Sequence, residues 1–210
     1  MCTFVLNETV AYYVQNGSPV YSLFLDASKA FDRLNFVKLF EKLINKGMCP
    51  ITVRFLLNMY MSQKIQVKWN GIISEPFNVK NGVRQGGVLS PLLLSVYIDD
   101  LLAELKKSGI GCYIGNRFYG VLGYADDLVL LCPTKEGLRQ MIKICEKYAI
   151  DHDIRFNGKK SQLLVFGSLT TQPVNITVNG EPVPVFDDAL HLGNFISTNN
   201  IYESIDYGIT

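Results

Sequence analysis

The stretch GVLGYADDLVLLC, residues 120–132, places two adjacent carboxylates, Asp126 and Asp127, between two apolar runs. Both runs are rich in residues that favour strands, so the segment is predicted to form two short buried strands that meet at the acidic pair. An isolated ionised carboxylate in apolar surroundings strongly disfavours folding unless a cation compensates it. We therefore expect a positively charged group or ion next to the pair.

The overall composition is that of a compact protein. The chain has 210 residues, of which 48% are hydrophobic and 19% charged, so it suits one domain over residues 1–210 with a full core. No apolar run reaches the roughly 18 residues of a membrane span. Because no basic leader precedes an apolar stretch at the N-terminus, neither membrane attachment nor secretion is expected.

The cysteine, histidine and charge content narrows the class of protein further. Five scattered cysteines without CxxC spacing predict reduced thiols in an intracellular protein, and they argue against a disulfide framework or a zinc site. Two histidines are too few for a histidine-rich metal site. A nucleic-acid enzyme usually carries more positive charge than the net +1 of this chain, unless its basic surface is local or lies on other segments.

Hydrophobic periodicity and turn residues divide the chain into short elements. Helices are predicted over residues 4–16, 35–46, 51–61, 90–107 and 134–148. Strands are predicted over residues 21–26, 161–166 and 176–178. Hairpins are expected over residues 64–79, turning at Asn70-Gly71, and at Asn179-Gly180 with a return strand over residues 183–186. The last dozen residues, from Asn199, carry no pattern and are expected to fray.

A second strand repeats the pattern of the acidic pair, because Ser22-Leu23-Phe24-Leu25 leads straight into Asp26. If the two strands lie side by side, Asp26, Asp126 and Asp127 converge on one edge. Converging carboxylates suit a hard divalent cation such as Mg²⁺, and two such ions can clamp a phosphate during its transfer. By contrast, the acidic pairs at residues 99–100 and 187–188 are expected to be solvated surface.

Three segments carry a resemblance to one enzyme family. Residues 124–127 resemble the YxDD box of reverse transcriptases, residues 24–32 resemble the FxDxxxAFD box, and residues 84–91 resemble the RQG…SP box. The three boxes occur in the family's order. Their wording is most similar to polymerases of non-LTR retrotransposons, of the long interspersed type, and the resemblance covers roughly residues 4–196.

The resemblance implies an α+β fold, the right-hand polymerase palm with part of the fingers, in which an antiparallel sheet is backed by helices. It implies two Mg²⁺ ions, with Mn²⁺ as an alternative, held by Asp26 and Asp126. Asp127 would complete the metal site less directly, and the carbonyl of Ala27 would face the nucleotide-bound ion. These carboxylates would be the catalytic residues.

Further roles follow from the same resemblance. Phe31 would pack under the sugar and exclude a 2′-hydroxyl, although a phenylalanine at a helix start is also an ordinary core residue. Arg84, Gln85 and Gly86 would lie against the incoming nucleotide and the template base. For Arg84 the open alternative is a solvated loop arginine, and for Gly86 it is an ordinary turn.

Two later segments match the family more weakly. Residues 157–161 resemble its NxxK box, so Lys160 would be catalytic by protonating or neutralising the leaving pyrophosphate, although a lysine in a turn is usually just solvent-facing. Leu192 and Gly193 resemble the hairpin that grips the primer, by a short match.

The implied activity is RNA-directed DNA polymerisation in retrotransposon replication, with dNTPs, a DNA primer and an RNA (or DNA) template. The family's upstream fingers and its thumb have no counterpart, so the chain is expected to be a piece of a longer polyprotein whose remaining polymerase segments are its partners. The element type implies cytoplasmic assembly and nuclear action. The contrasting reading is a truncated, non-catalytic palm remnant that serves as an RNA-binding or structural module. An RNA-templated RNA polymerase is disfavoured by Phe31.

Overall fold

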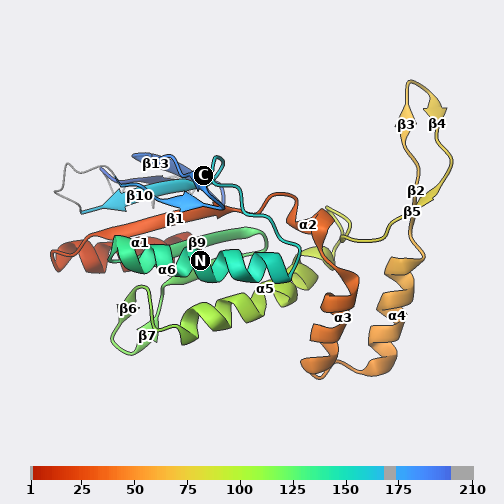
Figure 1. Cartoon of the computed structure of the whole chain (residues 1–210), viewed down its shortest axis with the longest axis horizontal. Helices are drawn as coiled ribbons and strands as arrows, with labels where there is room; N and C mark the ends of the chain where they lie inside the picture. The colour runs from red at the N-terminus through yellow and green to blue at the C-terminus, as the bar shows by residue number, and fades with distance from the viewer. Residues whose placement is uncertain (1, 168–173, 200–210) are drawn as a thin grey trace, which may run out of the picture.

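The computed structural model describes residues 2–167 and 174–199. Its centre is a four-stranded antiparallel sheet in the order β10-β1-β9-β8, formed by Gln162–Phe166, Val20–Asp26, Asp127–Cys132 and Val121–Tyr124 (Figure 1). The strand that ends with a carboxylate, β1, and the strand that begins with one, β9, are therefore neighbours. An α+β fold with a helix-backed antiparallel sheet was predicted and is confirmed.

Both faces of the two central strands, β1 and β9, are covered, because they alternate side chains between two apolar clusters. By contrast β8 is half-buried to exposed, so the prediction of two buried strands around the acidic pair is right for β9 and wrong for β8. Leu23 and Leu25 of β1 enter one cluster together with Leu130 of β9. Val20 of β1 and Leu131 of β9 enter the other cluster. This explains why the strands read as continuous apolar runs.

Each cluster is completed by different helices. Residues of α5 (Ser90–Lys107) and α6 (Lys135–Asp151) close the first cluster on one face of the sheet. The second cluster is closed by α1 (Cys2–Gln15) and by the hairpin of β13 (Asp188–His191) and β14 (Asn194–Ser197). Among the described residues, no helix is long and apolar enough to cross a membrane.

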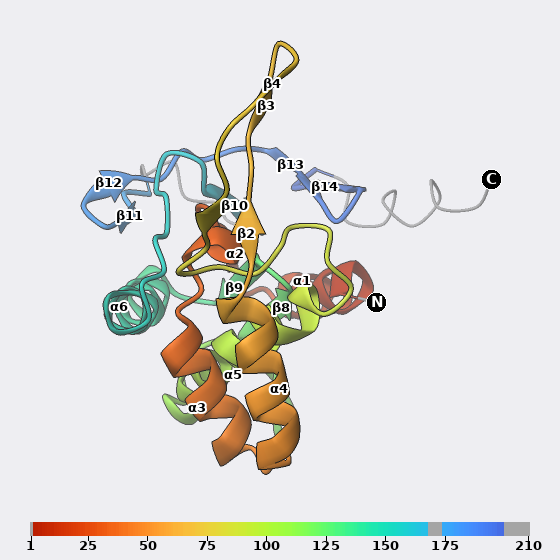
Figure 2. The same ribbon diagram turned by 90° about the vertical axis from the view of Figure 1, so that its right-hand side faces the viewer.

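Two helices and a long hairpin extend beyond one end of the sheet (Figures 1 and 2). The helix α3 (Phe36–Asn45) begins where Asn35 Oδ1 accepts a hydrogen bond from the backbone N–H of Lys38 at 3.2 Å, as an N-cap does. Pro50 opens α4 (Pro50–Met61), in the first-turn position where its missing N–H leaves no bond unmade. The short helix α2 (Ala30–Arg33) connects this region to β1.

The hairpin between α4 and α5 has the predicted turn at Asn70-Gly71, but its strands are shorter than expected. The structure forms only two-residue pairs, β2 (Lys64–Ile65) with β5 (Phe77–Asn78) and β3 (Lys68–Trp69) with β4 (Ile72–Ile73). All eight of these residues are exposed. With no face packed against the body of the domain, little holds longer strands together.

One predicted strand is wrong. The return strand of the Asn179-Gly180 turn is β12 (Glu181–Pro182), which pairs with β11 (Thr177–Val178), and it does not lie over residues 183–186. That later segment runs alongside β10 instead, with Leu163 N–H donating to Pro184 O at 3.0 Å and Phe186 N–H donating to Leu163 O at 2.9 Å. The edge of β10 offers these unpaired backbone groups, which the sequence of the segment does not reveal.

Other differences are smaller. The helix α6 extends to Asp151, three residues past its predicted end. The hairpin of β6 (Tyr113–Ile114) and β7 (Arg117–Phe118) was not predicted as an element. Fraying was expected from Asn199 onward, and residues 200–210 lie outside the described residues.

A polar network fastens α3 to the helices beneath the sheet. The Lys42 ammonium pairs with the Asp100 carboxylate and donates to the Tyr148 hydroxyl at 3.1 Å. The Tyr148 hydroxyl in turn donates to the backbone oxygen of Tyr97 at 2.6 Å. Lys46 pairs with Asp99. The acidic pair at residues 99–100 is exposed, as expected, but it also holds two lysines of α3.

Replacing Lys42 by Met is expected to lower the free energy of unfolding by about 2 kcal/mol, because it leaves the buried Tyr148 hydroxyl with one hydrogen-bond donor fewer. Urea denaturation measures the change. The matched variant Lys46→Met removes an exposed pair and is expected to leave the midpoint unchanged. Equal destabilisation by both variants would contradict the role given to the buried network.

Candidate active site

The three predicted carboxylates lie at one end of the central sheet. Asp26, the last residue of β1, is directly opposite Asp127, the first residue of β9. Tyr124 of β8 also pairs with Asp127, so Ala125 and Asp126 form a two-residue turn. Ala125 has a φ of 53°, in the left-handed region that such turns require at their first central position. The hairpin geometry thus presents Asp126 at the end of the sheet where Asp26 also lies, and both residues line the same cavity.

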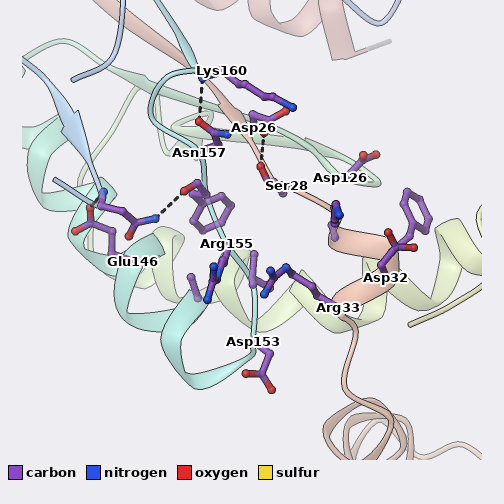
Figure 3. A pocket seen from close by; sticks show the side chains of 18 of the residues that line it. Asp26, Ser28, Asp32, Arg33, Asp126, Glu146, Asp153, Arg155, Asn157 and Lys160 are labelled. Carbon is purple, nitrogen blue, oxygen red and sulfur yellow. Dashed lines mark hydrogen bonds between the residues drawn. The ribbon is translucent and has the colours of Figure 1, made fainter. Parts of the chain in front are cut away.

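The backbone around Asp26 is fixed by the turn that precedes β10. The N–H of Asp26 donates to Ser161 Oγ at 3.0 Å, and its carbonyl accepts from the N–H of Asn157 at 3.0 Å. The Ser28 hydroxyl donates to Asp26 Oδ2 at 3.0 Å, as Figure 3 shows. Sequence reasoning missed both serines as supports. Their signals were a serine two residues after the aspartate and a serine just before an apolar strand.

The other two carboxylates act on Asp127. Partial burial raises the pKa of Asp127, and the neighbouring charges of Asp126 and Asp26 raise it further, while His191 acts in the opposite direction. His191 comes from β13, where its ring packs edge-on against Phe24 at 5.2 Å between centroids. Burial lowers the pKa of His191, and Asp127 partly offsets that effect. Negative charge is therefore concentrated at this end of the sheet, where β1 ends and β9 begins.

A cavity of about 970 Å³ opens beside this edge. Asp26 and Asp126 line it, and so do Phe31, Gln85 and Lys160, which come from three other segments. Its size is in the range of pockets that hold one small-molecule ligand. Residues far apart in the sequence are thus gathered around a single space that has carboxylates at its wall.

The loop that carries Gln85 is attached to the helix that carries Phe31. The N–H of Val83 donates to Phe31 O at 2.7 Å, and the N–H of Gly82 donates to Leu34 O at 2.8 Å. A Cβ on Gly82 would stand 2.6 Å from the backbone oxygen of Asp32, so only glycine allows this approach. The loop and α2 therefore form one wall of the cavity.

The predicted site residues divide into two groups. Those that line the cavity are Asp26, Ala27, Phe31, Gln85, Asp126 and Lys160. The structure places the others outside its lining: Asp127 at the same sheet edge, Arg84 and Gly86 on the exposed part of the loop, and Leu192 and Gly193 in the turn of the β13–β14 hairpin. Both residues of that turn have positive φ, 51° and 75°.

The oxygen donors at the sheet edge fit a hard divalent cation. Within residues 2–167 and 174–199, no three His, Cys, Asp or Glu side chains are grouped closely enough to hold a metal ion by themselves. Mg²⁺ does not need such a cage, because it is usually held by one or two carboxylates together with substrate phosphates and water. A cation would also offset both the burial and, after it, the repulsion by Asp126 and Asp26 that raise the pKa of Asp127.

Comparison with known proteins identifies related chains. A family model described as reverse transcriptase (RNA-dependent DNA polymerase) matches residues 3–185. The Pol polyprotein from the type-2 retrotransposable element R2DM of Drosophila melanogaster is 36% identical over 118 residues, which are 56% of this chain and 11% of that protein. The RNA-directed DNA polymerase from the mobile element jockey of the same species is 24% identical over 80% of this chain and 18% of its own length. The chain thus spans less than a fifth of either relative.

Solved structures show the same architecture. Apo telomerase from Candida tropicalis, truncated from its C-terminal domain, matches with a TM-score of 0.62 over 92% of this chain and 38% of its own, at 14% identity. Telomerase from the same species in complex with a fragment of telomeric RNA matches with a TM-score of 0.65 over 98% of this chain and 33% of its own, at 12% identity. These matches confirm the predicted polymerase palm fold.

Proposed function

This chain belongs to the reverse transcriptase (RNA-dependent DNA polymerase) family, and from that premise we propose that it is the catalytic palm, with part of the fingers, of a non-LTR retrotransposon polymerase. It would add dNTPs to a primer 3′-hydroxyl on an RNA template. The observation that supports this most is the pairing of Asp26 with Asp127 across β1 and β9, with Asp126 in the adjoining turn at the wall of the cavity.

In the proposed reaction the primer 3′-oxygen forms a bond to the α-phosphorus of the nucleotide, and the bond to pyrophosphate breaks. Two Mg²⁺ ions, or Mn²⁺ in their place, would neutralise the phosphates and lower the pKa of the 3′-hydroxyl. Asp26, Asp126 and the carbonyl of Ala27 would hold them, with Asp127 adding negative charge at the same edge. The Ser28 hydroxyl, which donates to Asp26, orients that carboxylate.

The other cavity residues act on the nucleotide. Gln85, on the loop tied to α2, has both a donor and an acceptor for the incoming base or its template partner. Lys160, whose side chain lies beside Asp26 in Figure 3, would deliver charge or a proton to the leaving pyrophosphate. Leu192 and Gly193 form the turn of the β13–β14 hairpin, and His191 of that hairpin interacts electrostatically with Asp127. From this position the hairpin would hold the primer end.

Primer extension tests the proposal. A DNA primer annealed to an RNA template is incubated with Mg²⁺ and dNTPs, and with this chain either alone or inside a longer polypeptide from the same reading frame. We expect template-dependent addition that stops when Mg²⁺ is chelated. RNA binding without any addition in either form would instead favour the non-catalytic palm remnant.

Phe31→Ala is expected to relax sugar discrimination. Phe31 is half-buried, lines the cavity and packs against the core, which supports a contact between its ring and the sugar. Removing the ring should raise kcat/KM for rNTPs relative to dNTPs by about tenfold to a hundredfold, the size of effect that pocket shape alone achieves. Single-nucleotide incorporation with each substrate measures the ratio. An unchanged ratio in an active variant would show that Phe31 is only a core residue.

A further inference from the structure

Besides Lys29 and Lys160, which belong to matched segments, two basic side chains outside every box also line the cavity. They are Arg33, at the end of α2, and Arg155, in the segment between α6 and β10. Neither has a carboxylate within ion-pair distance among the residues that the structure describes. Figure 3 shows the two side chains extending into the same part of the cavity from opposite sides. Carboxylates, Asp32 among them, line the cavity as well, so it is the part reached by both arginines, and not the cavity as a whole, that favours an anion.

The two arginines are fixed relative to the carboxylates. The carbonyl of Arg155 accepts the N–H of Ser28 at 2.8 Å, and Ala27 bridges to Phe156 next to it. On the other wall, the N–H of Arg33 donates to Lys29 O at 3.1 Å in the turn that starts α2. Both backbones are thus attached to the segment that follows Asp26. A ligand that reached both arginines would have its other end near the acidic edge.

Nearby carboxylates have other partners or lie elsewhere on the wall. Glu146 Oε1 accepts the N–H of Asn179 at 2.6 Å, and Glu181 lies 3.7 Å from the ammonium of Lys159. Asp153 also lines the cavity, but it is exposed, and in Figure 3 its carboxylate points away from the arginines. The arginine side chains therefore remain available to an incoming anion.

We propose that Arg33 and Arg155 bind the β- and γ-phosphates of the incoming nucleotide, and then the pyrophosphate that leaves. This rests on the proposed function, and it adds residues of the palm itself to the triphosphate site. Guanidinium groups match phosphate oxygens with two parallel hydrogen bonds, which makes arginine well suited to such a site. A cavity for one small ligand, shared with Asp26 and Asp126, favours a nucleotide over the backbone of a nucleic acid, which would run along an open face.

Inorganic tripolyphosphate is the probe, because it carries the anion without base, sugar or template. Its binding to the full chain is measured by isothermal titration calorimetry in the presence of EDTA, for the wild type, for Arg33→Gln/Arg155→Gln and for Arg117→Gln. Arg117, an exposed residue of the β6–β7 hairpin, lies outside the cavity lining and is the matched control. The thermal midpoint of each variant shows that it is folded.

We expect the double variant to weaken tripolyphosphate binding by about tenfold or more, and Arg117→Gln to leave it unchanged. Equal binding by the wild type and the double variant, equal weakening by all variants, or no binding to the wild type would each overturn the assignment. Because this measurement needs neither primer nor template, it can fail while primer extension succeeds. A chain that binds tripolyphosphate through these arginines but never extends a primer would refute the proposed function alone.

Discussion

Asp126→Asn is expected to abolish primer extension, lowering kcat by about a thousandfold or more. The substitution keeps the size of the side chain but removes a charge that the divalent cations need, and loss of several kcal/mol of stabilisation at the transferring phosphate corresponds to a factor of this order. Single-nucleotide incorporation under saturating dNTP measures it. The effect should appear in kcat, because under the proposed function this carboxylate would hold the cations at the reacting atoms.

The variant should fold normally, since Asp126 lies in a half-buried turn and, among the residues that the structure describes, its carboxylate accepts no hydrogen bond that holds the hairpin together. Asp151→Asn, an exposed aspartate at the end of α6 that does not line the cavity, is the matched control and should retain full activity. Survival of extension in Asp126→Asn would show that Asp126 is not a ligand of the catalytic cations.

Gly82→Ala is expected to destabilise the chain by about 3 kcal/mol, the largest stability effect that we predict for a single methyl group. The residue has a φ of 87°, which is unfavourable for alanine, and the new Cβ would lie 2.6 Å from Asp32 O and 2.8 Å from Asp32 Cα. Backbone cannot move aside as a flexible side chain can. The loop would have to separate from α2, so the variant should also raise KM for dNTPs by displacing Gln85.

Gly71→Ala separates the cost of the positive φ from the cost of the steric contact. Gly71 has a similar φ of 81°, but nothing lies within 4 Å of a Cβ built there. It should therefore show only the backbone penalty, about 1 kcal/mol, in chemical denaturation. If both variants lose the same stability, the close approach between the Gly82 loop and α2 has no energetic weight.

The sequence predicts the two central strands well because nearly all of their residues are buried. Both faces of β1 and β9 are covered, so the strands read as apolar runs, and each run meets a carboxylate at the same end of the sheet. The hairpin of β13 and β14 was visible only as the short match at residues 192–193. Its pattern is reversed, since Ala189 and His191 are buried while the larger Leu190 and Phe195 are exposed.

Parts of the site were likewise beyond sequence reasoning. The boxes point to Asp26, Asp126 and Gln85, because each belongs to a recognisable local pattern. Arg33 and Arg155 belong to none, and they share a cavity only because the segment after α6 bridges to Ala27. Such neighbours follow from the register of strands and loops, which a periodicity pattern does not encode.

The location of Mn²⁺ in crystals of this chain, found from its anomalous scattering, tests the carboxylate site most directly. We expect manganese in contact with carboxylate oxygens of both Asp26 and Asp126, and we expect that signal to be lost in Asp126→Asn. Manganese bound only elsewhere, or retained unchanged at this sheet edge in the variant, would contradict the assignment of these two aspartates as the ligands of the catalytic cations.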